Sequence, residues 1–277
     1  MSAAALPIPY CGLPPSPDAL WSRWNLDPVL IGALVLVTMA YALGAARASH
    51  KGSSLPRWRQ ASFYAGWAIT AFAVISPLCP LSVSLFAARV GQHMILALIG
   101  APLVAAGRPF AAIAHVSRRA GGIDHAAKNA APVGSALLFA GLLWFWHAPA
   151  PYGETFRSTF VYWSMHLTLY GAALWLWTSL IDAPASKAFH VIFAGIVTSA
   201  QMGLLGALIT LSSRALYAPH LLTTGAWGLT PLQDEQLGGA IMWAPGCAIF
   251  LAVSMLILWR ILGSDILEAG RAEMVSR

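Results

Sequence analysis

The chain has very little charge and no long polar segment. Of its 277 residues, 9% are charged and 58% are hydrophobic, and the mean hydropathy is +0.68. Soluble domains carry roughly 25% charged residues, so this composition excludes an ordinary soluble protein and indicates a membrane protein. The net charge of +6 is therefore interpreted through membrane topology, and no nucleic-acid partner is expected.

Cysteine is also scarce. Cys11, Cys79 and Cys247 have no CxxC spacing, which excludes a cysteine-based metal or redox motif of that kind. Cys11 and Cys79 are both expected at the outer side of the membrane, where either a disulfide or two free thiols is compatible with the sequence. No internal repeat is visible, so the duplicated halves of many transporters are not indicated.

Lysine is missing from every apolar run. Lys51, Lys128 and Lys187 all lie between runs, which excludes a retinal protein because its Schiff base needs a lysine inside the membrane. The predicted outer loops contain no nucleophile and base at a spacing that is typical of a catalytic pair. Glu154 and Asp234 are isolated carboxylates. No enzymatic activity is therefore expected.

Seven apolar runs fill the chain, and most reach the ~20 residues that a helix needs to cross a bilayer. They are Asp27–Ala46, Arg59–Leu78, Ser82–Gly107, Pro132–Trp146, Phe160–Leu180, Ala188–Leu211 and Leu237–Leu262. The predicted fold is an all-α polytopic membrane protein with seven transmembrane helices. The predicted parts are a Pro-rich outer cap (1–26), a membrane domain (27–262) and a cytoplasmic C-terminal tail (263–277).

The basic residues lie mainly on one side of this predicted bundle. Twelve of the sixteen Lys and Arg residues fall in alternate loops or at the C-terminal end: Arg47, Lys51, Arg57, Arg59, Arg108, Arg118, Arg119, Lys128, Lys187, Arg260, Arg271 and Arg277. The other loops hold only Arg23, Arg157 and Arg214, and Arg89 lies inside a run. Because loops rich in Lys and Arg stay in the cytoplasm, the N-terminus is predicted outside and the C-terminus inside. A bacterial inner membrane is the expected location.

The histidines divide by the same topology. Four are interpreted as solvated residues of the cytoplasmic side: His50, His115, His125 and His190. On the outer side, His93 is expected about 16 Å and His166 about 9 Å below the outer ends of their runs. His147 directly follows the fourth run, and His220 lies in the long outer loop. An ionisable side chain inside hydrocarbon costs a few kcal/mol and therefore indicates a function.

One outer layer of soft ligands is predicted from these depths. The candidate metal ligands are His93, His147, His166 and Met242. Imidazole and thioether groups together suit copper, and methionine favours Cu(I). The residues expected to orient these ligands or to offset charge are Arg89, Gln92 and Asp234.

Other interpretations of the same residues stay open. His147 could lie at the headgroup level beside Trp144, and Met242 could serve packing alone. His93 and His166 could instead bind a b-type haem between two helices. Asp234 could cap the last helix or pair with an arginine.

Three sequence blocks carry a family resemblance. They are Ser84–Met94 with Ala101–Leu103 and Gly107–Pro109, then Trp144–Pro149 with Tyr152, then Asp234–Gly239 with Met242–Gly246. In this order they resemble the CtaG family of cytochrome c oxidase assembly factors, over almost all of Asp27–Leu262. The resemblance implies a seven-helix protein that matures a caa3-type haem–copper oxidase, with oxidase subunits and a periplasmic copper chaperone as partners.

The chain departs from that family at Arg89-Val90, where many members have a His-Met pair. Two soft ligands are thereby lost, while His93 and Met94 still match. The resemblance therefore implies either copper delivery at the outer face or, as the alternative, a membrane scaffold that uses no metal.

Overall fold

The computed structural model describes residues 8–116, 122 and 132–275, and this part of the chain is helical with no strand. Its α-helices are α1 (Pro28–His50), α2 (Arg57–Ile75), α3 (Leu78–Ser84), α4 (Phe86–Ile95), α5 (Ala101–Ala106), α6 (Pro109–Ala114), α8 (Pro132–His147), α9 (Pro149–Glu154), α10 (Thr159–Ile181), α11 (Ala188–Thr210) and α12 (Pro231–Val275). The short helices are η1 (Pro17–Ser22), η3 (Ala185–Lys187), η4 (Ala218–His220) and η5 (Thr224–Trp227), and η2 (Leu96–Gly100) is a π-helix. The loop residues Arg118, Arg119, His125 and Lys128 lie outside the described residues.

Within the described ranges, four helices are long and apolar enough to cross a membrane. They are Pro28–His50, Phe86–Ala106, Ala188–Thr210 and Pro231–Leu256. A fifth span is obtained if α2 and α3, which meet at a 48° bend, are counted together. The predicted all-helical membrane class is therefore supported, whereas seven spans and their orientation remain predictions.

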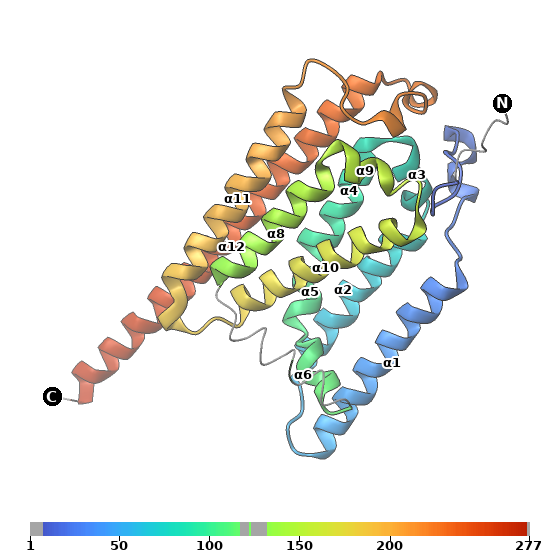
Figure 1. Cartoon of the computed structure of the whole chain (residues 1–277). Coiled ribbons are helices and arrows are strands. Elements are labelled where there is room, and N and C mark those ends of the chain that lie inside the picture. The colour runs from blue at the N-terminus through green and yellow to red at the C-terminus, as the bar shows by residue number, and fades with distance from the viewer. Residues whose placement is uncertain (1–7, 117–121, 123–131, 276–277) are drawn as a thin grey trace.

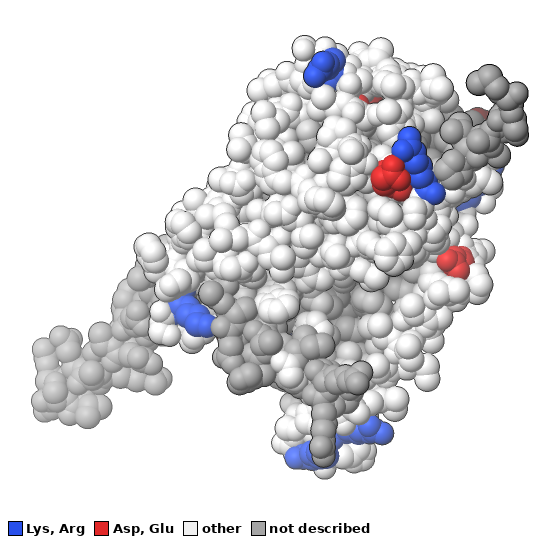
Figure 2. Space-filling view, viewed as in Figure 1, with Lys and Arg blue, Asp and Glu red and all other residues white. Residues whose placement is uncertain are grey.

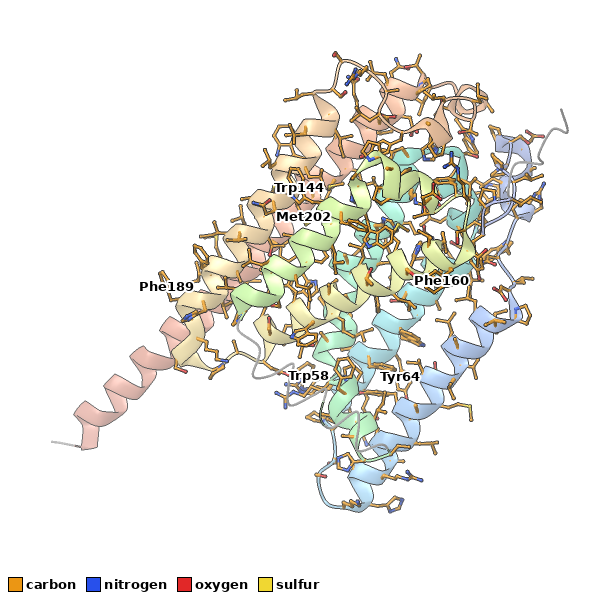
Figure 3. All side chains as sticks on the ribbon, viewed as in Figure 1. Trp58, Tyr64, Trp144, Phe160, Phe189 and Met202 are labelled. Carbon is orange, nitrogen blue, oxygen red and sulfur yellow. A yellow bond between two sulfur atoms is a disulfide. The ribbon has the colours of Figure 1, made fainter. Side chains whose placement is uncertain are left out.

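The long helices lie roughly side by side, and α11 packs along α12 (Figure 1). Helix α1 lies at the edge of the bundle, and its lower end contacts α6. Uncharged residues cover most of the visible face between the two ends of the bundle (Figure 2). Large apolar side chains such as Phe160 and Phe189 project from the ribbon and are 81% and 76% exposed (Figure 3). Such a surface suits contact with lipid.

Glycine allows the closest helix contacts. A Cβ on Gly206 of α11 would lie 2.8 Å from the carbonyl oxygen of Gly239 in α12, nearer than real Cβ atoms come. Gly238 lies against the ring of Phe86 on α4. Gly238 and Gly239 thus let α12 approach its neighbours closely, as small residues commonly do in membrane helices.

The third predicted run is not one continuous helix. Helix α3 ends at Ser84, Leu85 has extended backbone angles of φ −128° and ψ 130°, and α4 begins at Phe86. The prediction of a helix from Ser82 to Gly107 is therefore wrong at its outer end. The last helix also differs, because α12 begins at Pro231 and continues to Val275, past the predicted end at Leu262.

The outer cap is attached to the bundle by a disulfide between Cys11 and Cys79. Asp27 gives a second attachment, since its carboxylate accepts hydrogen bonds from the Tyr10 hydroxyl at 2.5 Å and from the amide of Val29 at 2.9 Å. The Tyr10 hydrogen bond is the main cause that lowers the pKa of Asp27. The same carboxylate caps the N-terminus of α1, so the cap and the first helix are fixed together.

Candidate metal centre

Helix α4 carries three of the seven predicted site residues, and Asp234 fixes its N-terminus. The two carboxylate oxygens of Asp234 accept hydrogen bonds from the backbone amides of Phe86 at 2.7 Å and Ala87 at 3.0 Å. The first amides of a helix have no partner within it, so this carboxylate on α12 supplies the missing cap. Asp234 therefore lies at the start of α4 and is hydrogen-bonded to its backbone, not paired with an arginine.

His93 of α4 and His166 of α10 face each other. Their ring centroids are 5.1 Å apart and the ring planes meet at 68°. The Nδ1 atom of His166 lies 3.0 Å from the carbonyl oxygen of Tyr162, which can only accept a hydrogen bond. His166 must therefore carry its proton on Nδ1, and its Nε2 has a free lone pair.

The Nε2 atoms of both imidazoles are buried, and neither has a hydrogen-bond partner among the described residues. Both rings line one small cavity of about 20 Å³, and His166 also lines a neighbouring cavity of about 200 Å³. The complete lining is His93, Met94, Leu96, Ala97, Phe139, Leu143, His166, Leu169 and Tyr170. A cavity of that volume holds roughly one water-sized group. Met94, whose side chain carries a thioether, is the third potential soft ligand that lines this cavity.

A π-helical turn directly follows α4, the helix that carries His93. Leu96–Gly100 forms the π-helix η2 between α4 and α5, and both Leu96 and Ala97 line the cavity. Turns of this kind are rare and occur frequently at functional sites. Here the π-helix begins two residues after Met94 in the sequence, directly after the end of α4.

Arg89 lies one turn before His93 and is only 2% exposed. Its Nη2 donates a hydrogen bond to the hydroxyl of Thr155 at 2.7 Å, and its guanidinium carbon lies 4.4 Å from the Phe156 ring centre and 5.0 Å from that of Tyr152. Aromatic faces and one hydroxyl thus surround the cation, and no carboxylate pairs with it within the described residues. A positive charge is fixed next to the histidine pair.

The other predicted residues occupy different places. Gln92 donates to the carbonyl oxygen of Ala73 at 2.7 Å and so joins α4 to α2. The Nδ1 of His147 lies 2.7 Å from the carbonyl oxygen of Leu143, and His147 does not line the cavity. Met242 is fully buried in the apolar core and does not line the cavity either.

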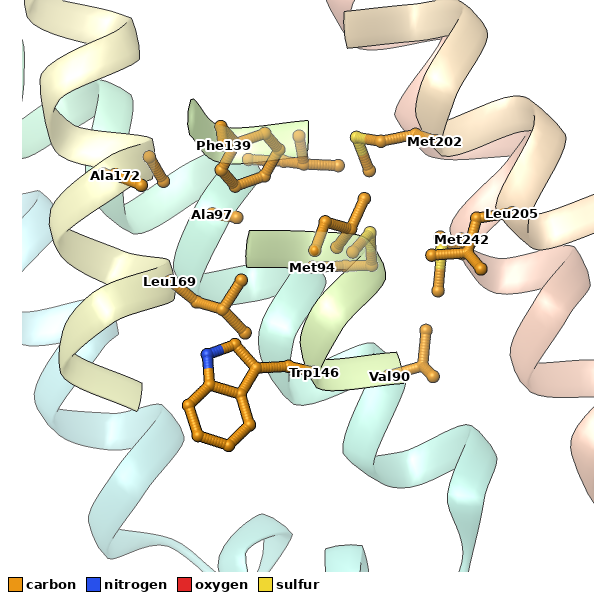
Figure 4. Packing of buried hydrophobic residues seen from close by; sticks show 14 of the residues in the cluster. Val90, Met94, Ala97, Phe139, Trp146, Leu169, Ala172, Met202, Leu205 and Met242 are labelled. Carbon is orange, nitrogen blue, oxygen red and sulfur yellow. The ribbon is translucent and has the colours of Figure 1, made fainter. Parts of the chain in front are cut away.

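Figure 4 shows Met242 of α12 with Met94 of α4 and Met202 of α11 in this core. Met94 therefore adjoins both the histidine cavity and the methionine-containing core. Among the described residues, no three His, Cys, Asp or Glu side chains come together in a metal-binding arrangement. The centre that remains consists of two imidazoles and one neighbouring thioether.

A second polar cluster, which sequence reasoning missed, joins α9 to the loop between α11 and α12. His220 is fully buried, and its Nε2 lies 2.6 Å from the hydroxyl of Tyr152. Burial lowers the pKa of His220 to about 3. The Glu235 carboxylate accepts hydrogen bonds from the amides of Leu216 and Tyr217 and holds the loop before η4. The Asp234-Glu235 pair in the sequence was the only available signal for this second carboxylate.

The fold and this centre define an all-helical membrane protein with a buried histidine pair. A sequence model of the family described as cytochrome c oxidase caa3 assembly factor (Caa3_CtaG) matches residues 39–264. The chain therefore belongs to this family, and the resemblance found in its sequence blocks is confirmed. No curated protein and no solved structure matches the chain. A family of assembly factors suggests a non-catalytic role and oxidase partners.

Proposed function

We propose that this protein helps to mature a caa3-type oxidase by holding Cu(I) between His93 and His166 at the outer face of a bacterial inner membrane. The observation that carries the proposal is the pair of buried, unpartnered Nε2 atoms beside a cavity of about 20 Å³. Buried polar atoms without partners cost about 1–3 kcal/mol each, so two of them at one cavity favour a ligand between them.

The nearby charge favours a monovalent ion. The Arg89 guanidinium repels any cation at the histidine pair, and by Coulomb's law the repulsion is doubled for a divalent ion. Met94 adds preference for Cu(I), since a thioether contributes little to a zinc site. Arg89 would then weaken retention of the ion, which suits a protein that must release copper to an oxidase subunit.

A b-type haem between His93 and His166 fits less well. The macrocycle would have to lie between the two rings, and the cavity that both rings line is only about 20 Å³. A neighbouring cavity of about 200 Å³ is lined by His166 but not by His93. A copper ion, delivered by a periplasmic copper chaperone, needs only the space of one small group. We therefore favour copper as the cargo.

The function is tested by complementing a strain that lacks the protein. His93→Ala should give oxidase that contains haem but lacks copper, with normal amounts of the assembly factor in the membrane. Extra copper in the medium should partly restore activity. The matched control is His115→Ala, which alters a histidine at the predicted cytoplasmic side and should behave as wild type.

Two outcomes would contradict copper delivery. One is normal copper content in the oxidase of the His93→Ala strain. The other is equal loss of haem and copper with both variants, which would indicate a scaffold that stabilises oxidase subunits without handling metal.

A further inference from the structure

The two disulfide-bonded sulfurs lie at the outer side of the candidate metal centre. Cys79 belongs to α3 and is fully buried, whereas Cys11 belongs to the cap and is partly exposed. Their Cα atoms are 5.5 Å apart although 68 positions separate them in the chain. Figure 1 shows the cap beside α3, at the end of the bundle that the sequence predicts to face the outer compartment.

Two hydrogen-bond donors point at these sulfurs. The Tyr162 hydroxyl lies 3.3 Å from Cys11 Sγ and 3.8 Å from Cys79 Sγ, and the Asn25 amide nitrogen lies 3.6 Å from Cys79 Sγ. A disulfide has no proton to give, so Tyr162 and Asn25 are the donors. Disulfide sulfur is a weak acceptor, whereas a thiolate carries a full charge and accepts strongly. The surroundings therefore suit the reduced pair better than the oxidised one.

The same tyrosine connects the sulfurs with the histidines. Its ring centroid lies 4.2 Å from that of His166, and the His166 ring lies 5.1 Å from that of His93. The hydroxyl end of Tyr162 contacts sulfur while its ring packs on the imidazole. Tyr162 thus contacts both the cysteine pair and one of the two rings that line the cavity.

We propose that Cys11 and Cys79, once reduced, form a second Cu(I) site that takes up the ion before it reaches His93 and His166. Uptake of Cu(I) by the two cysteines does not depend on the function proposed above. Only the transfer of the ion to His93 and His166 rests on that function. Two thiolates are the ligands that Cu(I) prefers most among protein side chains. Asn25 and Tyr162 would stabilise the thiolates until the ion arrives.

The redox step is an ordinary thiol–disulfide exchange with a dithiol protein of the outer compartment. The donor's two thiols give two electrons and two protons to the Cys11–Cys79 bond, and the donor leaves as a disulfide. Cu(I) then displaces the two protons and bonds to both sulfurs without changing its own oxidation state. The disulfide form cannot bind the ion, so the redox state of the pair controls uptake.

The test uses the full-length protein in detergent with His93→Ala and His166→Ala, so that the histidine centre is absent. Cys247→Ser removes the remaining thiol from every sample. After reduction with a phosphine and removal of the reductant, this protein should retain about one Cu(I) per chain and show thiolate-to-copper absorption in the near ultraviolet. The unreduced sample is the matched control and should retain none. Copper should also slow alkylation of Cys79.

Two further variants keep the test independent of folding. Cys11→Ser should abolish retention, and Tyr162→Phe should keep the ring packing but weaken Cu(I) binding about tenfold, because one charge-assisted hydrogen bond is lost. Absence of bound copper in the reduced protein, or identical affinity in the Tyr162→Phe variant, would overturn the proposal. A third outcome separates the two proposals. If the reduced protein retains Cu(I) but the histidines of the wild type bind none, the proposed function and the transfer step are wrong, whereas uptake by the thiolates is supported.

Discussion

Single buried polar atoms define the candidate centre. The Nε2 atoms of His93 and His166 have no partner within the described residues, and both rings line the same cavity. Other buried atoms, such as Arg89 Nε and Gln92 Oε1, also lack partners there, but neither of these residues lines that cavity. Because an unpaired buried polar group destabilises a fold, such groups persist mainly where they serve a ligand. The two imidazoles are the residues on which the copper proposal depends.

Met94 and Met242 form a matched pair for testing the thioether ligand. Both are buried, but only Met94 lines the histidine cavity. Leucine has nearly the same volume, so each substitution should cost less than about 1.5 kcal/mol of stability. We expect Met94→Leu to weaken Cu(I) retention about tenfold and Met242→Leu to leave it unchanged, as measured by competition with a Cu(I) chelator. Equal effects would show that Met94 has no special role.

His220 gives a prediction about pH. Its pKa is about 3 in the folded protein and roughly 6.5 in an unfolded chain, so between these values only the unfolded state binds the proton. The stability that depends on neutral His220 is therefore complete above pH of about 6.5 and is lost as the pH falls towards 3. Thermal unfolding should show a smaller decrease in Tm for His220→Gln than for wild type over this range. Parallel decreases would contradict the assignment.

The structure brings together two of the residues that the sequence groups as ligands and places the others elsewhere. His93 and His166 were chosen because hydrocarbon offers imidazole no water, and the structure brings them into contact. Met242 was chosen from its distance along a helix, but helix rotation decides which side chain faces a cavity. Met94 lines it instead, and the sequence motif contained Met94 without indicating that orientation.

At the scale of elements, α4 depends on a contact that is distant in sequence. Leu85 breaks the helix, and Asp234 caps the new N-terminus from 148 positions away. Apolar periodicity continues through such a break, so the sequence predicted one helix from Ser82. Only the packing of α12 on α4 places the carboxylate at the two free amides, and that packing could not be deduced from local patterns.

Asp234→Ala tests this cap. The two buried amides of Phe86 and Ala87 would lose their acceptor, which should lower the free energy of unfolding by about 2 kcal/mol. Asp234→Asn keeps one acceptor oxygen and should lose less. The measurement is thermal unfolding in detergent for both variants. An unchanged Tm for Asp234→Ala would show that α4 does not need the cap.

At the scale of the whole molecule, uncharged surface separates two polar ends. The inner end holds Arg108, whose guanidinium binds the Asp182 carboxylate through Nε and Nη2 at 3.0 and 2.6 Å. Arg59 lies 3.9 Å from the same carboxylate. This arrangement suits the predicted cytoplasmic side, where most basic residues fall, although the direction of the chain across the membrane remains a prediction.

Reporter fusions test the topology. Fusions after Lys128 and Gly270 should be cytoplasmic, and fusions after Pro151 and Gly225 should lie outside, because twelve basic residues fall on one predicted side and three on the other. An alkaline phosphatase reporter is active only outside, so the four fusions should give two clear classes. Phosphatase activity from the Lys128 fusion would reverse the assignment and move the candidate centre to the inner face.

Copper retention by the purified protein tests the central claim most directly. Ascorbate keeps copper as Cu(I) and leaves the Cys11–Cys79 disulfide closed, so only the histidine centre is measured. The wild type should retain about one copper per chain after desalting, and the His93→Ala, His166→Ala double variant should retain none while keeping its helical circular dichroism. Equal copper content in both proteins, or none in either, would contradict a Cu(I) centre between these two histidines.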